Sequence, residues 1–453
     1  MTEQARVLGA RAAMAVVAGS MLGIGIFLTP RIVATQMQSP VAFFGVWLLA
    51  GVAALCGAVA YAELATMMPR AGGDYVYLRR AYGPSVAFGA GWVLFGAVFT
   101  GSIAALAVPL CQYQLPALLG IDLSASVAGP VKAHSVVAIG IVLLFTAVNA
   151  AGTRLAALVQ DLTTWIPMAG FAVFAVWVLV AGPEPVVAPI VSSAPSWPTL
   201  SGFAVAFMAV YFAYSGWNGV IYVAGEVRRP GRNIPIGVVG GTVAVMGLYV
   251  LMCAAFVAAL GMSGLTGAFE AGTTVATATA GPAAGYIATL LIAFGLMGTL
   301  NGTILGGARV AMAMAEDGAL WRGFAAQTSR GVPERALWGQ SAWACVYILS
   351  GTFEQILNLV SLAMMVMGAL TVAAVFVLRR RDPNAVRPYR ATAYPWTPAV
   401  FLGVSAFVVV AMLLRAVAKP EAESLYPLLG LPLFGLAYAA HRGARALKTR
   451  RGS

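Results

Sequence analysis

The stretch Gly19–Pro30 has the residue types and the spacing that could bind a small zwitterion. Three glycines, Gly19, Gly23 and Gly25, lie inside one long apolar segment, and each costs about 1 kcal/mol relative to alanine in a helix interior. A helix interrupted at Gly23–Gly25 would present free amides at the start of one half and free carbonyls at the end of the other. Amides suit an anion and carbonyls suit a cation, so this interruption could hold both ends of a zwitterion.

The same glycines also have a purely structural explanation. Gly19 and Gly23 are four residues apart, and small residues at this spacing let two helices pack closely in a membrane. Bare backbone in the bilayer core is stable only where it lines a cavity or binds something. The spacing leaves both interpretations open.

A second candidate interruption lies at Ser215–Gly216, inside the apolar segment 201–225. Asn218 follows it, and its amide can both donate and accept hydrogen bonds. We therefore expect Asn218 to bond the bare backbone or to face a cavity, beside the indole of Trp217.

Two further polar residues, Asn301 and Thr303, lie in a later apolar segment. Polar side chains at such depth usually bond a neighbouring helix, and contact with a ligand or water is the alternative. Thr299 and Thr303 offer two oxygens, whereas a sodium ion needs several. The sequence therefore predicts no metal site and no cofactor.

The composition is that of an integral membrane protein, so membrane-spanning helices must position these residues. Hydrophobic residues make up 60% of the chain and charged residues 9%, and the mean hydropathy is +0.87. A membrane-spanning helix needs about 20 apolar residues. We predict an all-α protein with twelve transmembrane helices, at residues 8–35, 40–67, 86–115, 133–151, 157–180, 201–225, 236–261, 282–315, 337–350, 355–378, 398–416 and 425–441.

The basic residues predict the orientation. With both termini in the cytoplasm, only Arg31, Lys132, Arg415 and Lys419 fall outside, and the other 23 of the 27 Lys and Arg residues fall inside. This bias is the positive-inside rule, so the net charge of +12 indicates membrane topology and contact with anionic lipid rather than nucleic acid. We expect a multi-pass protein of the cytoplasmic membrane, inserted by its first apolar run without a cleaved leader.

The positions of the two interruptions predict an internal symmetry. They fall in the first span of each half if the halves comprise spans 1–5 and 6–10. An odd number of spans in each half inverts the second half in the membrane, and paired interrupted helices mark a transporter binding site. The predicted units are residues 1–180, residues 200–380, and residues 381–453 with the last two spans and the tail.

Several motifs in this order resemble the amino acid–polyamine–organocation transporter superfamily, and in particular its L-type amino acid transporter branch. They are Gly23–Phe27, Met68–Tyr75, Phe212–Asn218 with Glu226–Pro235, Asn301–Thr303 with Arg309 and Ala315–Gly318, and Arg379–Pro395. The resemblance implies a leucine-transporter-type fold, with five plus five inverted spans and two more. It also implies an amino acid substrate.

The resemblance further implies which residues bind the substrate. The amides around Gly23, Ile24 and Gly25 would hold its carboxylate, and Phe212 would close over it as a gate. Trp217, Asn218, Asn301 and Thr303 are candidates for the surrounding layer or for a gate. The carbonyls that would hold the amino group belong to Met21, Phe212 and Ser215.

The chain departs from the family at three positions. Many relatives carry a lysine in span 5, where alignment places Pro167 in this chain. Arginine/agmatine antiporters carry a carboxylate in span 6, where this chain has Asn218. The animal L-type subunits join a glycoprotein through a cysteine after span 3, and residues 115–132 contain none, so no disulfide-linked heavy subunit is expected.

Three acids, Glu63, Asp161 and Glu226, fall at inner span ends. They are expected to pair near the surface with Arg70, Arg154 or Arg228, and a role in an inner gate is the alternative. No acid is expected well inside a span, which argues against cationic substrates, and no basic residue lies near the interruptions, which argues against acidic ones.

We therefore predict a transporter of neutral L-amino acids that works by alternating access, as an exchanger. The absence of a titrating group beside the site disfavours the alternative, a proton-coupled symporter. A polytopic membrane enzyme would need a nucleophile with a base, or a metal cluster. A channel would need rings of charge or carbonyls. The sequence indicates neither, so no enzymatic activity is expected.

Overall fold

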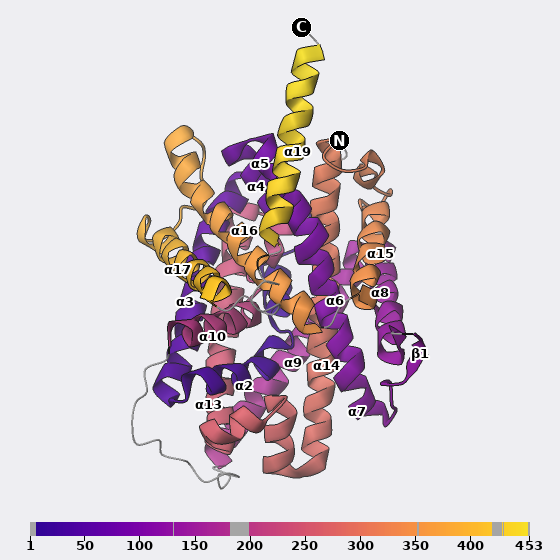
Figure 1. Ribbon diagram of the computed structural model, residues 1–453, viewed down its shortest axis with the longest axis vertical. Coiled ribbons are helices and arrows are strands. Elements are labelled where there is room, and N and C mark those ends of the chain that lie inside the picture. Colours follow the sequence, from indigo (N-terminus) through magenta and orange to yellow (C-terminus); the bar gives the residue numbers. More distant parts are fainter. Residues whose placement is uncertain are drawn as a thin grey trace.

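The computed structural model describes residues 6–129, 131–181, 199–350, 353–418, 428 and 430–451, and these form an almost entirely helical protein (Figure 1). The all-α prediction is confirmed except for one small hairpin. In it β1 (Ser126–Ala128) pairs antiparallel with β2 (Val131–Lys132), and Ser126 lies opposite Lys132.

Eight helical segments of the described chain are long and apolar enough to cross a membrane, and a bent pair makes nine. The pair is α1 (Ala10–Met21) and α2 (Gly25–Met37). These findings establish a multi-pass membrane protein, whereas the count of twelve stays a prediction. The predicted twelfth span begins at residue 425, and residues 419–427 and 429 lie outside the described part. The eight segments are Pro40–Met67, Pro84–Leu119, Ala133–Ala151, Thr153–Val180, Pro230–Gly267, Ala271–Glu316, Val360–Arg381 and Trp396–Ala418.

The remaining bounds complete the element order. The first half contains α3 (Pro40–Met67), α4 (Asp74–Tyr82), α5 (Pro84–Val93), η1 (Leu94–Phe99), α6 (Thr100–Pro109), η2 (Leu110–Gln114), α7 (Leu115–Leu119), α8 (Ala133–Ala151) and α9 (Thr153–Ala181). The second half contains α10 (Leu200–Ala213), α11 (Gly219–Tyr222), η3 (Ala224–Glu226), α12 (Pro230–Pro235), η4 (Ile236–Gly240), α13 (Gly241–Gly267), α14 (Ala271–Glu316), η5 (Arg322–Ala325), α15 (Glu334–Ser350) and α16 (Phe353–Arg381). The last two helices are α17 (Trp396–Ala418) and α19 (Gly430–Arg451).

Both predicted helix interruptions are present. Helix α1 ends at Met21 and α2 begins at Gly25, with a bend of 45° between their axes. Helix α10 ends at Ala213, and the backbone is not helical again until α11 begins at Gly219. Gly216 lies in this second interruption with a φ of +98°, a conformation that glycine adopts without a steric cost.

The core surrounds the third apolar segment, Pro84–Leu119. Within the most apolar window of this segment 89% of residues are buried, against 33% for the windows of α8, α9 and α17. Those three helices carry large apolar side chains on their outer faces, such as Val173 at 70% exposure. They therefore form the lipid-facing layer around a central packed helix.

Helices α13 and α14 extend beyond the predicted ends at residues 261 and 282. Each bends at a glycine with positive φ, Gly261 (+65°) and Gly281 (+82°), and then continues. The side chain of Glu270 caps the second extension, because its carboxylate accepts hydrogen bonds from the amides of Gly272 (2.6 Å) and Thr273 (3.0 Å). The apolar pattern stops at the glycines, which is why the sequence placed the span ends there.

Contacts join the arginine-rich segments at one end of the molecule, where the N and C marks of Figure 1 also lie. Arg79 pairs with Asp317 after α14, and Arg80 pairs with Asp382 after α16 at 2.8 Å. The Arg228 amide donates to the Leu8 carbonyl at 2.8 Å. We call this region the arginine-rich end.

Candidate functional site

A cavity of about 90 Å³ lies between the two helix interruptions. A cavity needs roughly 10–15 Å³ by this measure to hold one water, so there is room for several waters or a small solute. All six residues predicted to bind substrate line it: Met21, Gly23, Ile24, Gly25, Phe212 and Ser215. Among the described residues that line it, none is Lys, Arg or His.

The start of α2 supplies the donors of this cavity. The Gly23 amide donates to the Met21 carbonyl at 2.7 Å, and the Phe27 amide donates to the Ile24 carbonyl at 3.0 Å. Between them, the amides of Ile24, Gly25 and Ile26 donate to no acceptor in the described chain. These residues are buried, and three unpaired amides at a helix N-terminus form a binding site for an anion such as a carboxylate.

The carbonyl side of the cavity is partly occupied by a tyrosine hydroxyl. Tyr249 on α13 donates to the carbonyl of Met21 at 2.5 Å and lies 3.2 Å from that of Ala213. With the bond from Gly23, the Met21 oxygen already accepts two hydrogen bonds. A substrate ammonium that binds this oxygen must therefore displace Tyr249. Tyr249 was not predicted as a site residue, although a tyrosine inside an apolar span was a visible signal.

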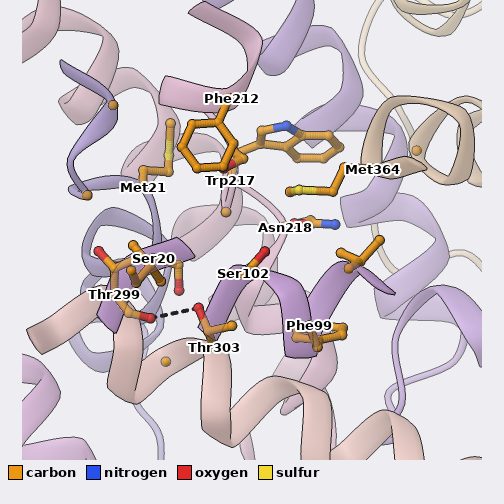
Figure 2. Close-up of a pocket in the computed structure, with 18 of the residues that line it drawn as sticks. Ser20, Met21, Phe99, Ser102, Phe212, Trp217, Asn218, Thr299, Thr303 and Met364 are labelled. Atoms are coloured by element: carbon orange, nitrogen blue, oxygen red, sulfur yellow. Dashed lines mark hydrogen bonds between the residues drawn. The ribbon is translucent and has the colours of Figure 1, made fainter. Parts of the chain in front are cut away.

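The walls of the cavity come from both interruptions and from several helices around them, α6, α14 and α16 among them. Figure 2 shows Phe212, Trp217 and Met364 together above the cavity, with Thr299 and Thr303 on the opposite side. The Thr299 hydroxyl donates to the Gly19 carbonyl at 2.8 Å, which fixes α14 against the end of α1. The Trp217 ring packs edge-on against Tyr61, with centroids 4.8 Å apart.

The predicted surrounding residues divide into two groups. Trp217, Asn218 and Thr303 line the cavity, whereas Asn301 does not. Asn301 is fully buried, and its amide donates to the Ala156 carbonyl at 3.1 Å and to the side chain of Gln160 at 3.0 Å. Residues two apart on a helix do not share a face, so Thr303 faces the cavity while Asn301 joins α14 to α9.

The predicted ion pairs of Glu63 and Glu226 are wrong. Glu63 binds Arg379 at 2.6 Å and Arg387 at 3.2 Å, not Arg70. Glu226 pairs with Arg309 of α14, not with Arg228. Both carboxylates are buried rather than near the surface, because helices distant in sequence supply their partners. The third acid, Asp161, interacts with Arg11 of α1.

One further acid, which lies outside the predicted spans and was not among the predicted site residues, is buried at the cavity. Asp74, the first residue of α4, is 1% exposed and lines the cavity. The hydroxyls of Tyr61 and Tyr222 donate to its two carboxylate oxygens. The preceding Gly72 and Gly73 have φ of +110° and +49°, and this turn brings α4 into the core. The Gly-Gly-Asp sequence was the signal that the sequence analysis left unused.

The Asp74 carboxyl is outside the membrane-spanning segments by position in the chain. Burial nevertheless raises its pKa above the ordinary value, although the hydroxyls that donate to it act in the opposite direction.

Among the described residues no group of three or more His, Cys, Asp and Glu side chains could hold a metal ion.

Comparison with known proteins finds a matching family and several relatives. The model of the amino acid permease family matches residues 8–434. A serine/threonine exchanger, SteT, of Bacillus subtilis (strain 168) is 29% identical, over 94% of this chain and 95% of its own. The mouse b(0,+)-type amino acid transporter 1 is 27% identical, over 92% of this chain and 84% of its own. The rat large neutral amino acids transporter small subunit 2 is 26% identical, over 89% and 75%.

Proposed function

The chain belongs to the amino acid permease family, and on this premise we propose that it exchanges neutral L-amino acids across the cytoplasmic membrane. The observation that carries the proposal is the trio of unpaired amides at Ile24, Gly25 and Ile26, two of which belong to residues that line a small cavity between two interrupted helices, Ile24 and Gly25. The amides bind the substrate carboxylate. The carbonyls of Met21, Phe212 and Ser215 bind its ammonium, and Phe212 closes over it.

We further propose the leucine-transporter-type arrangement of twelve spans, with inverted repeats at residues 1–180 and 200–380, and residues 381–453 as an addition. The two interruptions support it, because they occupy the first span of each half. Both termini are then cytoplasmic, in agreement with the arginine-rich end. Alternating access rocks one set of helices against the other around the fixed site.

The cavity supports a neutral substrate. Its lining is mostly apolar, with Ile24, Leu106 and Phe212 among the described residues, and it contains no basic side chain. Its one carboxylate, Asp74, already accepts hydrogen bonds from two tyrosines. A small amino acid with an uncharged side chain satisfies the amides and leaves no unpaired charge in the apolar part.

Exchange is supported by two residues of the chain and by the relatives. Pro167 stands where many relatives carry a lysine, and Asn218 stands where arginine/agmatine antiporters carry a carboxylate. One relative is itself named an exchanger. No disulfide-linked heavy subunit is proposed, because residues 115–132 contain no cysteine and the nearby Cys111 is fully buried.

The proposal is tested with purified protein in liposomes. Radiolabelled serine, threonine or leucine should accumulate when the liposomes are preloaded with unlabelled amino acid and remain near background when they are empty. Equal uptake into empty liposomes, driven by an imposed pH gradient and abolished by a protonophore, would instead establish proton symport.

Gly23→Ala should weaken substrate binding without disturbing the fold. An added Cβ would meet Leu106 at 3.5 Å and Thr299 at 3.6 Å, which are ordinary contacts, but its methyl group would stand beside the free amides. An overpacked site loses about 1–3 kcal/mol, so KM for exchange should rise about tenfold or more. The control is Gly247→Ala, whose Cβ would meet nothing within 4 Å. An unchanged KM in Gly23→Ala would contradict the carboxylate assignment.

A further inference from the structure

The buried carboxylate of Asp74 has no counter-charge. Among the described residues no Lys, Arg or His side chain forms an ion pair with it, whereas the other buried acids Glu63 and Glu226 each pair with arginine. An ionised carboxylate is costly to bury without such a partner. Asp74 is therefore either ionised and held by hydrogen bonds alone, or protonated.

Its surroundings are built from tyrosines. Tyr61 of α3 and Tyr222 of α11 donate to its two oxygens, while Tyr77 of α4 and Tyr211 of α10 also lie within electrostatic range. Helix α16 contributes Thr371, which does not titrate. The nearest basic residue on α14, Arg309, is paired with Glu226.

The two bonded tyrosines connect Asp74 to two other helices beside the cavity, α3 and α11. Tyr222 ends α11, the helix that follows the second interruption, and its carbonyl accepts a bond from the Gly72 amide at 3.2 Å. Its hydroxyl accepts a bond from Asn218 at 3.2 Å, and Figure 2 shows that Asn218 lies at the cavity. Asp74 therefore joins α3, α4 and α11 at the side of the cavity towards the arginine-rich end.

We propose that Asp74 is a proton-binding positioning residue: its protonated carboxyl stays buried against Tyr61 and Tyr222 and holds the arginine-rich end of the cavity closed, and its ionisation releases that end. This inference rests on the proposed exchange. A carboxylate that is buried without a counter-charge gains more from water than from two hydroxyls, so loss of the proton favours an arrangement in which Asp74 is hydrated. The proton comes from water and returns to the same side, so exchange stays neutral.

The first test measures the exchange rate of preloaded liposomes from about pH 5 to about pH 8, above the ordinary range of an aspartate. Wild-type exchange should accelerate as the pH rises, by about fivefold, the factor that corresponds to about 1 kcal/mol. Asp74→Asn, which cannot ionise, should be slow and independent of pH over this range. Asp74→Glu should restore a pH-dependent rate.

Tyr61→Phe distinguishes a proton site from a structural role. Each tyrosine hydroxyl stabilises the ionised carboxylate, so removing one should move the midpoint of the pH profile to higher pH. Asp122→Asn, the same change at an exposed loop carboxyl, is the matched control. If Asp74→Asn keeps the wild-type pH profile, or if it exchanges faster than the wild-type protein at about pH 8, the proposal is overturned.

A second measurement needs no transport and separates this proposal from the proposed function. The folded protein retains the Asp74 proton to a higher pH than the unfolded chain does, because burial raises its pKa. Stability is therefore greatest at low pH and falls as the pH rises through that pKa. The unfolding temperature of wild-type protein in detergent should fall relative to that of Asp74→Asn as the pH rises. A constant difference between the two would overturn the proposal even if exchange is never observed.

Discussion

Gly216→Ala is expected to abolish exchange and to lower the yield of folded protein. Gly216 has a φ of +98°, where an L-residue is strained by about 1–2 kcal/mol. An added Cβ would also stand 2.5 Å from the carbonyl carbon of Ser20 and closer still to its oxygen. The backbone of one interruption would have to move away from the other, so the cavity between them would be lost.

The measurement compares exchange in liposomes with the amount of monodisperse protein recovered in detergent. Gly247→Ala is the matched control, because its Cβ enters open space on the outer face of α13. Wild-type exchange by Gly216→Ala would show that the two interruptions need not touch. Total loss of folded protein would be resolved with Gly216→Asn, since asparagine tolerates positive φ better than alanine.

The second large effect is expected at the buried ion pair of Glu226 and Arg309. Their side chains are 4% and 2% exposed, and Arg309 also donates to the Gly331 carbonyl at 3.0 Å. Removing one partner of such a pair leaves a buried charge and costs about 3–5 kcal/mol. Glu226→Gln and Arg309→Gln should each unfold at a much lower temperature and lose exchange, since the pair joins η3 to α14 at the arginine-rich end.

The double variant Glu226→Gln/Arg309→Gln separates charge from shape. It leaves no unpaired charge, so its loss of stability should be smaller than the sum of the two single losses. Asp382→Asn is the control at the exposed Arg80–Asp382 pair, where the change should be below about 1 kcal/mol. Additive effects of the two single substitutions would mean that the charges at 226 and 309 act independently.

The helix interruptions were predictable because their cause is local. Gly23, Gly25 and Gly216 weaken a helix wherever they stand, so the sequence could indicate where the backbone opens, although close helix packing remained the alternative for Gly19 and Gly23. The apolar pattern likewise located the long helices, because each carries its own membrane-length run. The bounds of α13 and α14 were missed, since glycine corners there join apolar to more polar helical segments.

The partners in the site were not predictable in the same way. Tyr249 meets Met21 across 228 positions of sequence, and Arg379 meets Glu63 across 316. A single sequence carries no record of which distant helices touch. Asn301 bonds a neighbouring helix, as polar side chains at such depth usually do. Its partner on α9 and the burial of Asp74 could not be predicted, because they depend on the packing of α14 and α4. The sequence Gly72-Gly73-Asp74 indicates a turn, but it does not indicate that Asp74 lies in the core.

The hydroxyl of Tyr249 lies between the carbonyl ends of α1 and α10, at Met21 and Ala213. It lies 2.5 Å from the Met21 oxygen and 3.2 Å from the Ala213 oxygen, and one O–H donates at full strength to only one of them. In the proposed binding mode, a substrate ammonium at the Met21 carbonyl would leave the Tyr249 hydroxyl to donate to the Ala213 carbonyl instead. The end of α10 would then gain a full hydrogen bond when the end of α1 binds substrate, through rotation about the C–O bond of one tyrosine.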